Sequence, residues 1–153
     1  MLTVVPVLAL ALVGATTAAS AGTSSLAGSW DLQDFDRAQR VCVQYGAGDG
    51  THRSYLIFAV TGSWSTDLDF GMRDLPPGWV ATQGRLPSGS NHPDPDDGGV
   101  LINGWIHVQG PSSVPQGTYH PRIRVSDGST TETTPVEVVV TTASWLDCMQ
   151  ARG

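Results

Sequence analysis

Three aspartates form the densest acidic cluster of the sequence, within the segment Asn91–Asp97. Asp94, Asp96 and Asp97 could supply carboxylate oxygens to Ca²⁺, with Asn91 or backbone carbonyls completing the shell. The spacing lacks the register of an EF-hand loop with its distal glutamate, and the interleaved prolines hinder convergence of the side chains. A solvated turn is therefore the favoured interpretation. Calcium is kept as the alternative, and no other cofactor is indicated.

Trp105 is the aromatic residue whose surroundings most favour binding. It lies on the more polar side of its expected strand, together with Asn103 and His107. An indole beside amide and imidazole groups suits the apolar ring face and hydroxyl rim of a sugar, and it also suits a protein partner. These three residues are the candidate ligand-binding set. The other tryptophans are expected in the core, as Trp64 and Trp79, or over sheet edges, as Trp30 and Trp145.

No residue set has the spacing of a familiar catalytic centre. The chain contains neither the HExxH pattern of zinc proteases nor the GxSxG pattern of serine hydrolases. Asp67 and Asp69 share one strand face and could form a carboxylate pair for glycoside hydrolysis, but surface solubility is the simpler explanation. His107 and His120, together with an aspartate, could bind a metal if their strands were neighbours, but outward-facing strand histidines are usually only surface residues. We expect a protein that is not an enzyme.

Cys42 and Cys148 are the whole thiol content of the chain. In an exported protein such a pair predicts a disulfide, and two cysteines without a C-x-x-C spacing are weak evidence for zinc. In the expected strand Arg40–Tyr45, alternation places Cys42 opposite Val41 and Val43. The bridge is therefore predicted to be a peripheral staple that holds the C-terminal tail, and not a pin through the core.

Residues 1–21 have the pattern of a signal peptide. Leu2–Val13 is apolar and uncharged, and it leads to the small residues Ala19–Ala21, which form a cleavage site. A membrane anchor is the alternative, but polar residues and glycine interrupt the apolar run early. We expect a secreted protein, free of the membrane after cleavage, with a single domain over residues 22–153.

Charge and composition narrow the class of partner. The net charge is −6, there is no lysine, and no basic stripe is evident in the sequence, so nucleic acid and anionic lipid are poor partners. Only 14% of residues are charged, while 18 glycines and 10 prolines indicate many turns. The expected partner is an extracellular protein or a glycan.

The elements that would position these residues are short strands. Gly117–Val140 shows two alternating runs around Asp127-Gly128, which predicts a hairpin with a tight turn. Ser54–Trp64 is apolar on both faces and is expected to be central and covered on both sides or nearly so. Thr66–Met72 and Val100–Val108 also alternate. About seven to nine strands are expected, which favours an antiparallel β-sandwich over a barrel.

The turn residues of the second half carry a family resemblance. Leu75–Gly78, Pro115–Tyr119, Ser126–Gly128 and the alternating Val136, Val138 and Val140 follow the order found in immunoglobulin-like domains of bacterial surface proteins, which are similar to cadherin-like modules. The resemblance covers roughly residues 75–141 and implies an all-β, immunoglobulin-like fold. The tandem repeats of that family are absent, and the cysteine pair is not part of its pattern. The overall layout also resembles small exported actinobacterial proteins.

These observations support a secreted, non-enzymatic binding or adhesion module. One alternative is a carbohydrate-binding module that uses Trp105. Another is a protease inhibitor, because Gln83–Gly99 is expected to be a long irregular loop, and loops of that length in compact domains tend to be functional or mobile.

Overall fold

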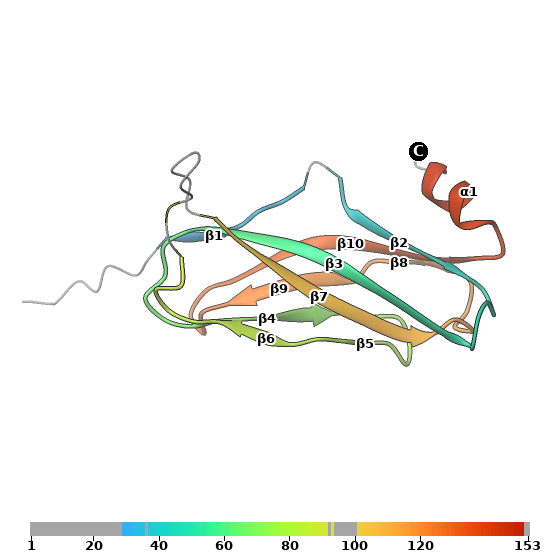
Figure 1. Cartoon of the computed structure of the whole chain (residues 1–153), viewed down its shortest axis with the longest axis horizontal. Helices are drawn as coiled ribbons and strands as arrows, with labels where there is room; N and C mark the ends of the chain where they lie inside the picture. Colours follow the sequence, from blue (N-terminus) through green and yellow to red (C-terminus); the bar gives the residue numbers. More distant parts are fainter. Residues whose placement is uncertain (1–28, 36, 92, 94–100, 152–153) are drawn as a thin grey trace, which may run out of the picture.

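The computed structural model describes residues 29–35, 37–91, 93 and 101–151. They form two β-sheets that pack face to face (Figure 1). The four-stranded sheet contains, in order, β1 (Trp30–Leu32), β3 (Thr51–Gly62), β7 (Leu101–Pro111) and β5 (Val80–Ala81). The six-stranded sheet contains β2 (Gln39–Gln44), β10 (Thr131–Thr141), β9 (Arg122–Ser126), β4 (Leu68–Arg73) and β6 (Gly84–Leu86), and β8 (Gly117–Tyr119) also pairs with β10.

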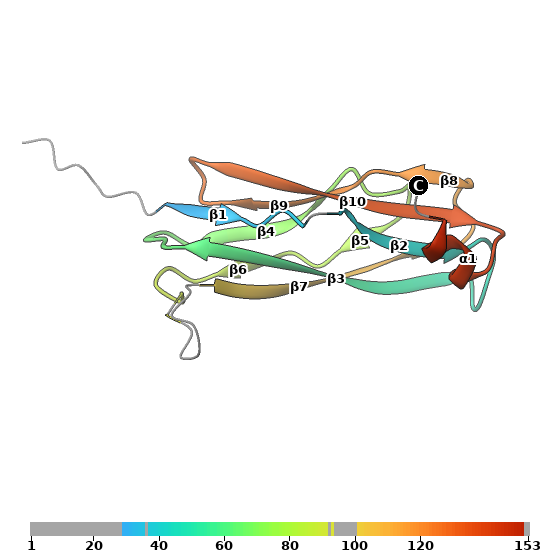
Figure 2. The same ribbon diagram turned by 90° about the horizontal axis from the view of Figure 1, so that it is seen from above.

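The architecture confirms the prediction of an immunoglobulin-like β-sandwich. Figure 2 shows the layers from above, with β3 and β7 on one side and β9 and β10 on the other. Neighbouring strands pair antiparallel, except that β2 runs parallel to β10. The chain passes from the four-stranded sheet to the six-stranded sheet between β1 and β2. These first two strands therefore form an edge of each sheet. The described residues form ten strands, more than the seven to nine predicted, because β6 lies in the segment predicted as a loop and the first run of the predicted hairpin is divided into β8 and β9.

Alternate residues of both sheets fill the space between the layers. In β3 the inward residues are Leu56, Phe58 and Val60, and all three are buried. The rings of Phe58 in one sheet and Phe70 in the other lie 4.8 Å apart. Such contacts remove apolar surface from water, which is the main stabilising contribution to a domain of this size.

The hairpin predicted within Gly117–Val140 is confirmed. β8 and β9 pair successively along β10, and Gly128 takes a φ of +92° in the turn, which glycine adopts without strain. The Asp127 carboxylate accepts the backbone N–H groups of Ser129 and Thr130 and the indole N–H of Trp30. These hydrogen bonds hold the pKa of Asp127 well below its ordinary value. Because Trp30 belongs to the other sheet, the turn also joins the two layers.

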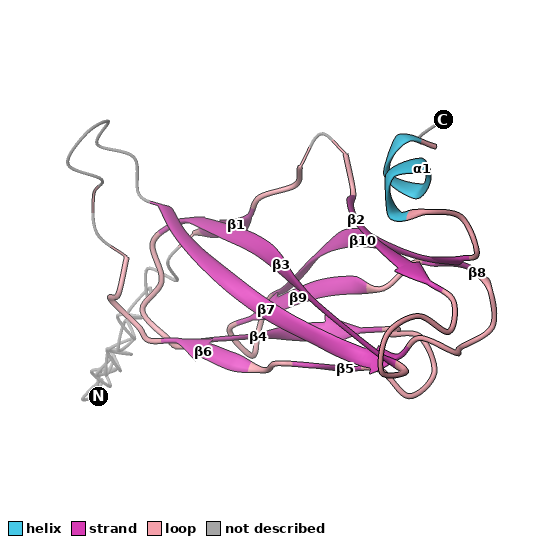
Figure 3. Ribbon diagram, turned by 45° about the vertical axis from the view of Figure 1, so that its right-hand side comes forward, coloured by secondary structure: helices cyan, strands magenta, loops and turns pink. Residues whose placement is uncertain are grey.

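The C-terminal tail forms a short helix. α1 (Trp145–Gln150) begins after Ser144, whose side chain accepts the N–H of Asp147 as an N-cap. Figure 3 shows α1 outside the sandwich, beside β2 and β10. Across the described residues, no helix has the length and apolar character needed to cross a membrane.

Four details of the prediction were wrong. β3, which includes most of the predicted strand Ser54–Trp64, is central in its sheet, but the side that carries Tyr55 and Ile57 is exposed. Gly84–Leu86, within the predicted loop Gln83–Gly99, forms the strand β6, which pairs with β4. Trp30 is buried in the core, whereas Trp145 is 62% exposed on α1. Tertiary packing decides each of these points, and alternation alone does not.

Candidate functional site

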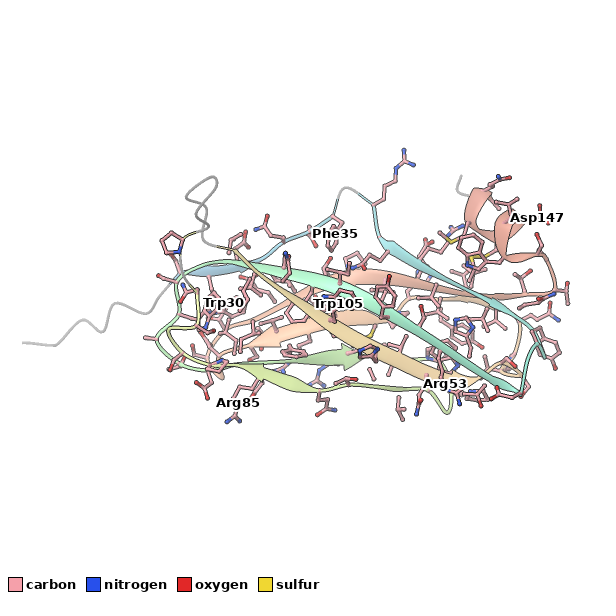
Figure 4. All side chains as sticks on the ribbon, viewed as in Figure 1. Trp30, Phe35, Arg53, Arg85, Trp105 and Asp147 are labelled. Atoms are coloured by element: carbon pink, nitrogen blue, oxygen red, sulfur yellow. A yellow bond between two sulfur atoms is a disulfide. The ribbon has the colours of Figure 1, made fainter. Side chains whose placement is uncertain are left out.

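The outer side of the four-stranded sheet carries an exposed group of large apolar side chains. Tyr55, Ile57 and Trp105, which we call the aromatic face, are 53%, 38% and 56% exposed. The rings of Tyr55 and Trp105 stack with centroids 4.9 Å apart and planes 21° apart. Figure 4 shows Trp105 over the middle of this sheet. Monomeric proteins rarely gather large apolar groups on the surface without a binding role.

Strand register brings these residues together. Ile57 of β3 lies opposite Trp105 of β7, and Tyr55 lies opposite His107. The two aromatic rings are therefore diagonal neighbours, a spacing that large side chains can bridge. On the inner side, Phe58 packs against the backbone at Gly104, where a Cβ would come within 2.2 Å of its ring. Gly104 thus lets β7 lie close to the core while Trp105 points outward.

Polar side chains surround the aromatic face. Asn103 and His107, predicted with Trp105, lie on the same strand face and are exposed, so the structure places the three predicted residues together. Beside them is a shallow hollow of about 390 Å³, lined in part by Arg53, His107 and Gln109. The ion pair of Arg53 with Asp49 is long, at 3.4 Å, and both side chains are largely exposed. Pairs of this kind are weak, so the Arg53 guanidinium remains available.

The edge of β3 beside the aromatic face is fixed by a side chain instead of a strand. The backbone N–H of Gln33 donates to the Ala59 carbonyl, and the chain then turns away from β3. It returns at Gln39, whose side-chain amide accepts the N–H of Ile57 at 2.9 Å and donates to the C=O of Ile57 at 2.6 Å. The loop between these two anchors contains Phe35, which is 43% exposed. Gln39 therefore satisfies the Ile57 backbone while leaving its side chain open to solvent.

The predicted disulfide between Cys42 and Cys148 is present, with 106 residues of separation. It joins β2 to α1, and neither cysteine belongs to the core cluster, which confirms the peripheral staple. The Arg40 guanidinium adds a hydrogen bond to the Cys148 carbonyl and an ion pair with Glu137, at 3.0 and 2.8 Å. These contacts hold α1 against the outside of the sandwich.

The remaining candidates do not form a site. Asp67 and Asp69 pair with Arg85 on an exposed surface, as expected for solubility. His107 belongs to the four-stranded sheet and His120 follows β8 of the other, so the idea that they share a metal was wrong. Among the described residues, no three potential metal ligands cluster. The proposed calcium ligands Asp94, Asp96 and Asp97, like residues 1–21, lie outside the described residues.

Tyr55 and Ile57 are the site residues that sequence reasoning missed. Their strand is apolar on both faces, and the pattern was interpreted as a strand covered on both sides. A partial signal was available within Arg53–Thr61, because the face of Tyr55 and Ile57 carries a charged residue at one end, Arg53, whereas the face of Phe58 carries no charge there.

Comparisons with known proteins identify a family and a broad structural likeness. The model of a family of unknown function, DUF5980, matches residues 31–142. No curated protein matches the sequence. Among solved structures, the ASH/PapD-like domain of human CEP192 is 10% identical with a TM-score of 0.41, covering 91% of this chain and all of that one. The VesB protease of Vibrio cholerae is 12% identical with a TM-score of 0.35, covering 72% of this chain and 30% of the protease.

Proposed function

The chain belongs to the DUF5980 family, whose function is unknown, and we propose that it is an exported, noncatalytic module that binds an extracellular ligand on its aromatic face. The exposed stack of Tyr55 on Trp105 carries this proposal. Export is supported by the disulfide between Cys42 and Cys148, since such bonds persist in oxidising compartments.

A carbohydrate is the ligand class that the chemistry favours. An exposed indole offers an apolar surface to the C–H groups of a sugar ring. The amide of Asn103, the imidazole of His107 and the guanidinium of Arg53 stand around it as donors and acceptors for hydroxyl groups. A sheet face presents these groups on a rigid support, which lowers the entropy lost on binding.

A glycan array followed by affinity electrophoresis tests this proposal. The wild-type protein is expected to bind a defined set of glycans, and Trp105→Ala is expected to weaken that binding at least tenfold. Tyr55→Ala should weaken it less, because Trp105 remains but loses its stacking support. Trp145→Ala is the matched control, since Trp145 is equally exposed but lies on α1. A silent array, or equal losses for Trp105→Ala and Trp145→Ala, would contradict the proposal.

A protein partner is the second candidate, favoured by the exposed Ile57 and Phe35. Aliphatic side chains contribute to protein interfaces through buried area but offer sugars no stacking surface. Ile57→Ser separates the two ligand classes. If the ligand is a glycan, binding should change less than threefold, whereas a protein interface centred on this face should lose most of its affinity.

A further inference from the structure

A second hollow, of about 790 Å³, lies in the six-stranded sheet along the edge of β4. Three arginines contribute to its walls, namely Arg73, Arg85 and Arg124, together with a single carboxylate, that of Asp69. Figure 4 shows Arg85 projecting from the lower edge of the molecule, away from Trp105. The hollow is therefore separate from the aromatic face.

Strand pairing explains why this hollow exists. β6 pairs with β4 only along Leu68–Phe70, because the preceding residues cross over from β5 in the other sheet. Beyond Phe70, no described strand lies on that side of β4. Gly71 faces outward there and has no side chain, and a Cβ would come within 3.2 Å of the Gln83 side chain. A larger residue at this position would occupy the space.

Positively charged side chains lie close together around the hollow, and their repulsion is unfavourable unless an anion binds between them. Arg73 lies directly opposite Arg122 in the pairing of β4 with β9, and Gly71 lies opposite Arg124. Like charges directly opposite each other destabilise a sheet. Arg122 and Arg124 donate to the neutral hydroxyls of Thr133 and Thr131, and neither they nor Arg73 form an ion pair with any described residue. This cationic group stands out in a protein whose net charge is −6.

We propose that this hollow binds an oxyanion, a carboxylate or phosphate group, between the guanidinium groups of Arg73 and Arg124. Guanidinium groups are planar, permanently charged and weakly hydrated, and they bind carboxylate and phosphate with two parallel hydrogen bonds. Arg122 adds positive charge at one margin. Arg85 stands at the other margin but is partly neutralised by Asp69, at 2.9 Å. The bound anion would relieve the repulsion between Arg73 and Arg122.

An NMR titration with sodium phosphate at pH 7 tests this proposal. The side-chain Nε–Hε signals of Arg73 and Arg124 are expected to shift and saturate, whereas the signal of Arg37, which is exposed between β1 and β2, stays in place. Arg73→Ala combined with Arg124→Ala should weaken phosphate binding at least tenfold. Arg37→Ala removes one charge of the same kind outside the hollow and should change phosphate binding less than twofold.

A second variant distinguishes binding in a defined hollow from the general attraction of an anion to positive charge. Gly71→Gln fills the hollow and keeps every arginine, so phosphate binding should fall at least tenfold while the far-UV spectrum and thermal midpoint show that the sandwich is intact. Polygalacturonate and neutral dextran, compared by affinity electrophoresis, distinguish a free anion from one carried on a polymer. Retardation by polygalacturonate without phosphate binding, lost in the double variant but kept in Trp105→Ala, would place the anion on a polymer. Binding of phosphate alone would make it a free ion. Absence of saturation with phosphate and with polygalacturonate, or equal effects of Arg37→Ala and the double variant, would overturn the proposal.

Discussion

The two outer faces of the sandwich differ far more than its two inner faces. Inside, both sheets present buried aliphatic and aromatic side chains such as Val60 and Val125. Outside, the four-stranded sheet carries the stacked pair of Tyr55 and Trp105, whereas the six-stranded sheet carries arginines opposed across β4 and β9. Only alternate residues are needed for the core, so the outward positions are free to hold different chemistry. Because the two outer faces differ in chemistry, we expect them to bind different ligands.

The largest effect on the free energy of unfolding is expected at Phe58, whose ring packs between the two sheets. Phe58 is fully buried and contacts Phe70 of the opposite sheet, and it also packs under Gly104 beside Trp105. Phe58→Ala should lower the free energy of unfolding by about 3 to 5 kcal/mol, because it leaves a cavity between the layers. Urea denaturation measures this loss. Tyr55→Ala, on the same strand but facing outward, should stay within about 0.5 kcal/mol. Comparable losses for the two variants would show that the faces are not separable from the core.

Removing the disulfide should weaken the attachment of α1 to β2 and leave the outer faces of both sheets unchanged. Replacing Cys42 and Cys148 with alanine frees α1 and restores entropy to the unfolded chain, which should cost about 2 to 4 kcal/mol. Thermal unfolding with and without reductant measures the change, and the reductant should affect only the wild-type protein. Loss of ligand binding in the double variant at a temperature where it remains folded would mean that the edge and the faces are coupled.

Asp127 tests the connection between the two sheets. Its pKa lies well below the ordinary 3.8, chiefly because of the backbone N–H of Thr130 and also because of the Trp30 indole. The unfolded chain takes up a proton at this carboxyl at higher pH than the folded chain does. The stabilisation is therefore complete above about pH 4 and is lost progressively as the pH falls below it. Asp127→Asn should have a lower thermal midpoint than the wild type at pH 6, and the gap should narrow towards pH 2.

A gap between wild type and Asp127→Asn that stays constant over this range would show that the carboxylate charge does not join the layers. Asp31→Asn is a suitable control, because Asp31 is an exposed carboxylate on β1 without a role in the turn.

The smallest effect is expected at His52, which stacks on Trp79 with ring centroids 5.7 Å apart. Partial burial lowers the pKa of His52 below its ordinary 6.5. The unfolded chain therefore binds the proton more readily, and the protein should lose a little stability as the pH falls below 6.5. His52→Gln should remove that dependence in thermal unfolding between pH 7.5 and 5. An unchanged dependence would assign it to another group.

Local patterns predicted the layers well, because inward and outward residues alternate in strands. The hairpin around Asp127-Gly128 and the outward position of Cys42 both followed from alternation and turn chemistry. The exposure of Tyr55 did not, because an apolar strand does not reveal which of its faces meets the other sheet. The pairing of Arg73 with Arg122 was also inaccessible, since it depends on register between strands that are far apart in the sequence.

Collisional quenching of Trp105 tests the binding role of the aromatic face most directly. In Trp145→Phe, Trp105 becomes the one exposed tryptophan of the described chain, because Trp30, Trp64 and Trp79 are buried. Acrylamide quenching is then measured with and without a polysaccharide that retards the protein in affinity electrophoresis. We predict that the polysaccharide shields Trp105 and lowers the quenchable fraction of the fluorescence. Retardation without any change in quenching would place the ligand elsewhere and contradict the proposed function.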